Sequence, residues 1–86
     1  MQIFQLNERY TIVCDALNTR NGFKHEAQLM LDGYEIGDKV KVFYINRTWE
    51  KFAYETVIHK LLEKTTRFTD AEKEQFKTEL NTKYGY

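Results

Sequence analysis

The segment 23–31 alternates in polarity and constrains the fold of this chain more than any other stretch. One face would carry Phe23, His25, Ala27, Leu29 and Leu31, and the other Lys24, Glu26, Gln28 and Met30. A period of two residues is that of a β-strand with one wet face. The segment is flanked by Asn21-Gly22 and Asp32-Gly33, which are strong turn signals. We therefore predict a strand that continues into antiparallel neighbours at both ends.

Two further strands are expected around it. Residues 10–15 form a short strand that has Tyr10, Ile12 and Cys14 on one face. Phe4 and Leu6 either extend this strand toward the N-terminus or belong to a separate segment that precedes it. Residues 16–22 are expected to be a loop. The segment 34–38 reads as an irregular connection, in which Gly37 supplies a positive φ or a bulge. Residues 39–45 are mostly apolar on both faces, which predicts the central strand.

Two helices follow the strands. The first is expected over 49–64, with Thr48 as N-cap and a buried stripe made by Tyr54, Val57, Ile58, Leu61 and Leu62. Thr69 and Glu72 form a capping box for a second helix, which runs to about Lys83. Its apolar stripe is thin, so it either folds back on the first helix or waits for a partner. The predicted fold is α+β, a three-stranded antiparallel meander covered by one helix with a C-terminal helix added (β-β-β-α-α).

Composition limits the classes of protein to consider. The 86 residues suffice for a single domain, 1–86, with 66–86 as a C-terminal helical extension. Lys+Arg and Asp+Glu are both 13, which argues against a general nucleic-acid binder. The N-terminus lacks the pattern of a signal peptide, and no segment approaches the roughly 18 apolar residues of a membrane span. We therefore expect a cytoplasmic protein that does not enter a membrane.

No catalytic or cofactor motif is evident. Cys14 is the only cysteine, and His25 and His59 are the only histidines. A zinc site needs three or four ligands, which these residues would supply only by a tertiary coincidence. A buried Cys14 and a hydrogen-bonded core histidine are the better interpretations. We therefore expect no enzyme, no metal and no cofactor.

The junction 46–49 is the strongest candidate site, because it places an amide, a guanidinium, a hydroxyl and an indole between a strand and a helix. Arg47 could pair with a carboxylate or phosphate while Trp49 or Tyr44 stacks, assisted by free N–H groups at the helix start. The alternative is structural, with Thr48 capping the helix, Trp49 in the core and Arg47 in solvent. The predicted partner-binding residues are Arg20, Lys24, Tyr44, Asn46, Arg47, Trp49, Glu50 and Lys51.

A basic sheet face is the second candidate. Arg20, Lys24, Lys41 and Arg47 could gather around an exposed Phe43 and bind single-stranded nucleic acid by phosphate pairing and stacking. Glu26 lies on the face of Lys24 and opposes that interpretation, and cross-strand charge pairing explains the pattern as well.

The block 22–62 resembles a group of small, mostly uncharacterised proteins encoded by phages and prophages of Gram-positive bacteria. The resemblance is carried by Gly22-Phe23-Lys24-His25, Asp32-Gly33-Tyr34-Glu35, the string from Tyr44 to Glu50, and Val57 with Leu61-Leu62. It implies a non-catalytic inhibitor of a host defence protein, of the anti-CRISPR type, that occludes a functional surface such as that of a Cas nuclease. Glu26, Glu35, Asp38 and Glu50 could then meet a basic channel. Homodimerisation through the last helix or an edge strand is a further possibility.

Overall fold

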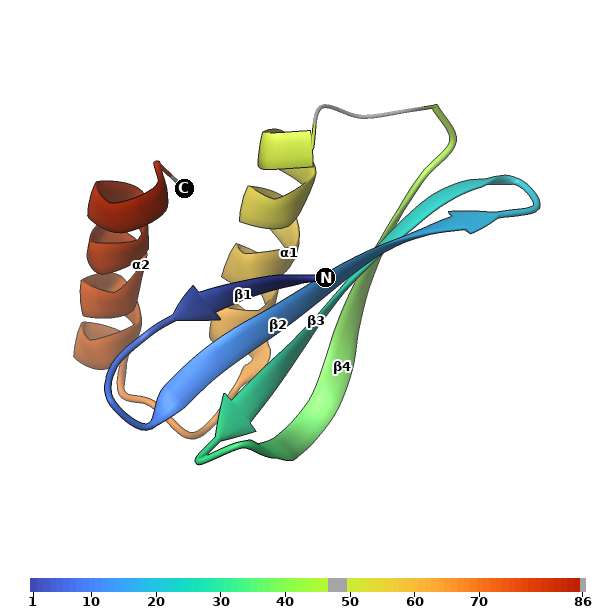
Figure 1. Cartoon of the computed structure of the whole chain (residues 1–86). Helices are drawn as coiled ribbons and strands as arrows, with labels where there is room; N and C mark the ends of the chain where they lie inside the picture. Colours follow the sequence, from blue (N-terminus) through green and yellow to red (C-terminus); the bar gives the residue numbers. More distant parts are fainter. Residues whose placement is uncertain (47–49, 86) are drawn as a thin grey trace.

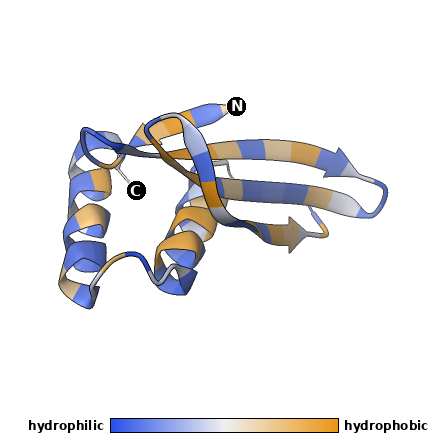
Figure 2. Ribbon diagram, turned by 90° about the horizontal axis from the view of Figure 1, so that it is seen from below, coloured by the Kyte–Doolittle hydropathy of each residue, from blue (hydrophilic) through white to orange (hydrophobic). Residues whose placement is uncertain are grey.

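The chain folds as a sheet of four strands followed by two helices (Figure 1). The computed structural model describes residues 1–46 and 50–85. The elements run in the order β1 (Gln2–Gln5), β2 (Tyr10–Thr19), β3 (Gly22–Leu31), β4 (Tyr34–Tyr44), α1 (Glu50–Lys64) and α2 (Asp70–Tyr84). Both helices lie on the same side of the sheet, and its other side is uncovered (Figure 2). The predicted α+β class is therefore confirmed.

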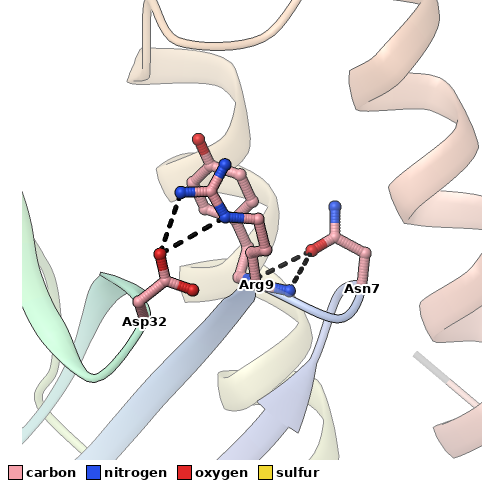
Figure 3. Close-up of polar contacts among 4 residues, drawn as sticks. Asn7, Arg9 and Asp32 are labelled. Atoms are coloured by element: carbon pink, nitrogen blue, oxygen red, sulfur yellow. Dashed lines mark hydrogen bonds and ion pairs between the residues drawn. The ribbon is translucent and has the colours of Figure 1, made fainter.

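The sheet has one strand more than predicted, because the segment around Phe4 is a separate strand. β1 pairs antiparallel with β2, with Phe4 opposite Ile12. The reversal is built on Asn7, whose side-chain oxygen accepts hydrogen bonds from the backbone N–H groups of Arg9 and Tyr10, both at 2.8 Å (Figure 3). An Asn side chain that bonds backbone two and three residues later is a turn former in its own right.

The same turn is tied to the β3–β4 turn by an ion pair. The Arg9 guanidinium donates to one carboxylate oxygen of Asp32, at 2.9 Å from Nη2 and 3.3 Å from Nε (Figure 3). The backbone N–H of Asp32 also donates to the Arg9 carbonyl at 2.9 Å. The hydrogen bond to Asp32 raises the pKa of the Arg9 guanidinium further above its ordinary value. Because both side chains are exposed, the ion pair fixes the geometry of the two turns more than it stabilises the fold.

The predicted loop 16–22 is wrong. β2 continues to Thr19, and β3 begins at Gly22, so only Arg20 and Asn21 form the turn between them. Pairing with β3 along the whole of β2 supplies hydrogen bonds that outweigh the weak strand propensity of Ala16 and Asn18. The resulting hairpin projects beyond the rest of the sheet (Figure 1).

The predicted position of the third strand is also wrong. The strand order is β1-β2-β3-β4, so β4 lies at an edge and β2 and β3 are central. The outward face of β4 is exposed and carries Lys41 and Phe43, of which Phe43 is 67% accessible. Residues 34–38 belong to this strand, and the expected bulge is present, because Gly37 has φ 70° and the register shifts between Ala27 and Leu29.

The core lies between the sheet and the helices, as the alternation of 23–31 predicts. His25, Ala27 and Leu29 are buried on the helix side. The five residues predicted for the stripe of α1 are buried. Phe52, which its helical spacing also predicts to broaden the stripe, is exposed, so that part of the prediction is wrong. The fully buried side chains at the centre of the core include Leu6, Ile12, Cys14, Val57, Ile58, Leu62 and Leu80.

α2 packs on its own chain, as the first of the two alternatives for its apolar stripe predicts. The capping box of Thr69 and Glu72 is present and starts the helix. Phe76 and Leu80 are buried, and the Phe76 ring lies edge-on to Phe68 at 4.8 Å. At the far end Tyr84 lies edge-on to Phe4 at 5.2 Å and receives a hydrogen bond from the backbone of β1. Neither helix is long and apolar enough to cross a membrane, a finding that covers the described residues.

Candidate functional site: the open sheet face

The face of the sheet opposite the helices carries the side chains that alternate with the core residues, and we name it the open sheet face. β1 contributes Ile3, β2 Val13 and Leu17, and β4 Phe43. Ile3, Leu17 and Phe43 are all exposed although they are large and apolar. Exposed apolar side chains that lie together on one surface indicate an interaction site more than singly scattered ones do. The residues of this face that the argument uses are Ile3, Val13, Asp15, Leu17, Lys24, Glu26, Gln28, Met30, Glu35, Lys41 and Phe43.

Glu26 is the electrostatic centre of this face. Its carboxylate lies 3.0 Å from the Lys24 ammonium and 3.9 Å from that of Lys39, and the residue is only 9% exposed. The hydrogen bond from Lys24 lowers the pKa of Glu26, and the nearby charges of Lys39 and Lys41 add to the effect against the opposing cost of burial. Glu26 is therefore ionised at neutral pH, and it compensates lysines that would otherwise make the face basic.

A row of three side chains crosses the strands at one end of this face. Lys24 pairs with Leu17 on one side and with Phe43 on the other. The amine of Lys24 is directed to Glu26, so its aliphatic stem lies between the two apolar neighbours. Cross-strand neighbours lie about 4.5–5.5 Å apart at Cβ, close enough to form one continuous surface. We name the row of Leu17, Lys24 and Phe43 the apolar platform. The charge of its Lys24 is partly neutralised by Glu26.

A shallow hollow of about 360 Å³ lies at the other end of the face. Its apolar lining comes from Met1, Ile3, Val13 and Met30, and its acidic lining includes Asp15, Glu26 and Glu35. The N-terminal amine lies 3.9 Å from Asp15. The hollow and the platform together give the open sheet face apolar area and both signs of charge, which suits non-covalent binding.

The predicted site residues do not form one surface. Arg20 lies in the β2–β3 turn, and Lys24 belongs to the open sheet face. Tyr44 faces the core, where its ring lies edge-on to His25 at 5.7 Å. Neighbouring strands place Phe23 opposite Tyr44 and Lys24 opposite Phe43, so Lys24 and Tyr44 point to opposite sides of the sheet.

The junction itself is described only at its borders. Asn46 is exposed just after β4, and Glu50 begins α1. Arg47, Thr48 and Trp49 lie outside the described residues, so the prediction that they bind a partner stays a prediction. Lys51 is exposed, and a Cβ built on Gly85 would lie 3.2 Å from its Nζ. A lysine amine near the C-terminal end of α2 is favourable for the helix dipole.

The cysteine and the first histidine are core residues. Cys14 is fully buried, and burial raises the pKa of its thiol to about 12, with a smaller contribution from Asp15. A neutral, inaccessible thiol is a poor nucleophile. His25 is buried between Tyr44 and Tyr54, edge-on to both rings. Within 1–46 and 50–85, no group of three or more His, Cys, Asp or Glu could hold a metal ion.

Comparison of the chain with protein-family models, with curated proteins and with solved structures yields no match.

Proposed function

We propose that this protein acts by binding a partner protein through the open sheet face, without catalysis. The observation that carries the proposal is that the helices cover one side of the sheet and leave Ile3, Leu17 and Phe43 exposed on the other. An apolar platform with a polar surround is the usual anatomy of a protein interface, in which a few large side chains supply most of the binding energy. Phe43, at the β4 end of the apolar row, is the anchor side chain we expect.

The charge arrangement favours a protein over a nucleic acid. Binding to phosphates would need free lysines, but Lys24 and Lys39 already lie near the ionised carboxylate of Glu26. Phe43 beside Lys24 and Lys41 still offers one stacking side chain between cations, which keeps a small nucleic-acid-binding accessory protein as the second candidate. The two candidates differ in salt dependence, because binding through phosphates weakens steeply as salt is added.

The class of partner comes from the resemblance of 22–62 to phage and prophage proteins of Gram-positive bacteria. On that basis the partner is a host defence protein, for example a Cas nuclease, whose functional surface the domain would occlude. Asp15 and Glu35, which line the hollow, would face basic residues of such a surface, whereas Glu26 is already paired with Lys24. The domain would inhibit by covering this surface.

The experiment is capture from a Gram-positive host lysate after nuclease treatment, with wild-type protein and the Phe43→Ser variant as parallel baits. The proposal predicts that the wild type retains one protein in stoichiometric amount and that Phe43→Ser does not. The activity of the captured protein should be inhibited in the purified complex. A matched control is Phe52→Ser, because Phe52 is 54% exposed but lies on α1. If an untreated lysate yields only RNA or DNA, and this binding is lost at raised salt, the proposal is overturned in favour of the second candidate.

A further inference from the structure

A second concave surface lies on the helix side of the sheet, where β4 begins and α1 ends. It is a cleft of about 620 Å³, within the range of small-molecule sites. Its floor is apolar and consists of core residues, namely Leu29, Ile36, Val40 and Leu61. The start of β4 and the connection from α1 to α2 lie at the same end of the molecule (Figure 1). The cleft lies on the other side of the sheet from the open sheet face, and of the described residues only Lys39 lines both it and the hollow of that face.

The β4 bulge shapes one wall of the cleft. Ala27 pairs with Val40 and Leu29 with Ile36, so Gln28 alone faces residues 37–39. The Gln28 side chain is buried, and its amide donates to the carbonyls of Ile36 at 2.9 Å and Gly37 at 3.2 Å. A buried amide that satisfies the carbonyls of an irregular strand fixes the bulge in place. Bulges are enriched next to binding sites, where they redirect side chains.

The rim of the cleft is positively charged. It contains Lys39, Lys64 and Arg67 against a single carboxylate, Asp38. The ammonium of Lys39 lies near Glu26 on the other side of the sheet. Lys64 and Arg67 form no ion pair with any described residue, so they are the cations available to a ligand. Lys64 also offsets the negative end of α1, because it lies in the last turn of that helix.

We propose that this cleft binds an organic anion that has an apolar body and a phosphate or carboxylate group. The apolar floor would take the body of the ligand, and the guanidinium of Arg67 with the amine of Lys64 would hold the charged group. The hydroxyls of Thr65 and Thr66, which also line the cleft, add donors for its oxygens. An apolar floor with a few converging polar groups is the common composition of such sites.

The test is an NMR titration of the whole chain with four probes. Phenyl phosphate and 3-phenylpropanoate carry both features of the proposed ligand. Benzyl alcohol carries only the apolar body, and inorganic phosphate only the charge. We expect saturable shifts of the backbone amides of Gly37, Asp38 and 65–67 with the first two probes, and at least about tenfold weaker binding of the other two. The stronger of the first two identifies the preferred charged group.

Paired substitutions assign the binding to the cleft. The double variant Lys64→Gln, Arg67→Gln should weaken binding of the better probe by about tenfold or more. The matched control, Lys51→Gln with Lys83→Gln, removes the same charge from exposed positions outside the cleft lining and should change affinity less than twofold. The proposal is overturned by an absence of saturable shifts up to about 10 mM probe, by equal binding of benzyl alcohol, or by equal effects of the two double variants.

Discussion

Replacing Gly22 by alanine tests how closely the β2–β3 hairpin approaches the end of β4. Gly22 has φ 150°, a conformation that L side chains rarely adopt. A Cβ built on it would lie 2.1 Å from the Tyr44 carbonyl oxygen and 3.1 Å from the Ile45 Cα and carbonyl oxygen. All three obstacles are backbone atoms, so the clash can be relieved only if the strands move apart.

The expected loss of stability is the sum of three contributions. Forcing alanine into this backbone region costs about 1–3 kcal/mol. Moving β4 away weakens at least one strand hydrogen bond, for about 1 kcal/mol more. The lower chain entropy of unfolded alanine offsets about 0.5–1 kcal/mol. We therefore expect Gly22→Ala to lower the free energy of unfolding by about 2 kcal/mol, a substantial share of the stability of a domain this small.

Urea denaturation followed by circular dichroism measures this loss. With a slope of about 1–1.5 kcal/mol per molar urea, the midpoint should fall by about 1.3–2 M. Gly37→Ala is the matched control, because Gly37 also has a positive φ, 70°, but a Cβ there would meet nothing within 4 Å. It should cost about 1 kcal/mol or less. A Gly22→Ala midpoint equal to that of Gly37→Ala, or within about 0.5 M of wild type, would refute the reasoning.

Three further predictions concern the core, Glu26 and Cys14. Leu62→Ala should lower the free energy of unfolding by about 3 kcal/mol in the same assay, because Leu62 is fully buried. The control Phe52→Ala, at an exposed position of α1, should change the free energy of unfolding by less than about 0.5 kcal/mol. The folded pKa of Glu26 lies below its ordinary value of 4.5, so the stability contributed by its ionised form is present above pH 4.5 and is lost as pH falls through the folded pKa. The stability difference between wild type and Glu26→Gln should accordingly shrink on acidification, and a difference that stays constant down to about pH 2 would contradict the assignment. Burial raises the pKa of the Cys14 thiol to about 12, so Ellman's reagent at about pH 8 should label it only in urea, and labelling of the native protein within the mixing time would contradict this.

Local patterns predict those parts of the fold in which one physical effect dominates. The strand at 23–31, the stripe of α1 and the capping box at Thr69 each depend on a few neighbouring residues, and the structure confirms all three. The bulge at Gly37 belongs with them, because a glycine just after an Asp-Gly turn supplies the conformation that it needs. The wet face predicted for the strand at 23–31 is wrong at Glu26 and Gln28, which are buried.

Strand order and strand ends depend on partners far along the chain and are less predictable. The apolar character of both faces of 39–45 resembles that of a central strand, but on β4 the outward residue Phe43 belongs to the exposed sheet face. Leu17 was predicted in a loop for a similar reason, because the strand that pairs with it lies later in the chain. The alternation of Val13, Asp15 and Leu17 was available in the sequence, and it would have placed Leu17 beside Lys24 had β2 been extended to Thr19.

The candidate site in the structure differs from the predicted junction 46–49 for a related reason. The residues of the junction are adjacent in sequence, whereas the open sheet face is assembled from all four strands. The signal for it was the polar face of 23–31, in which Glu26 and Gln28 prove to be buried. Their burial follows from the neighbouring strands, and the pairing register of those strands cannot be predicted from the local sequence pattern.

The central claim is that the open sheet face is the surface that contacts the partner. The most direct test is titration calorimetry of the captured partner with Phe43→Ser and with Phe52→Ser, both first shown to fold like wild type. We expect Phe43→Ser to weaken binding by about thirtyfold or more, equivalent to about 2 kcal/mol for an anchor side chain, and Phe52→Ser to bind like wild type. Wild-type affinity for Phe43→Ser together with a loss for Phe52→Ser would contradict the claim and place the contact on the helical side of the molecule.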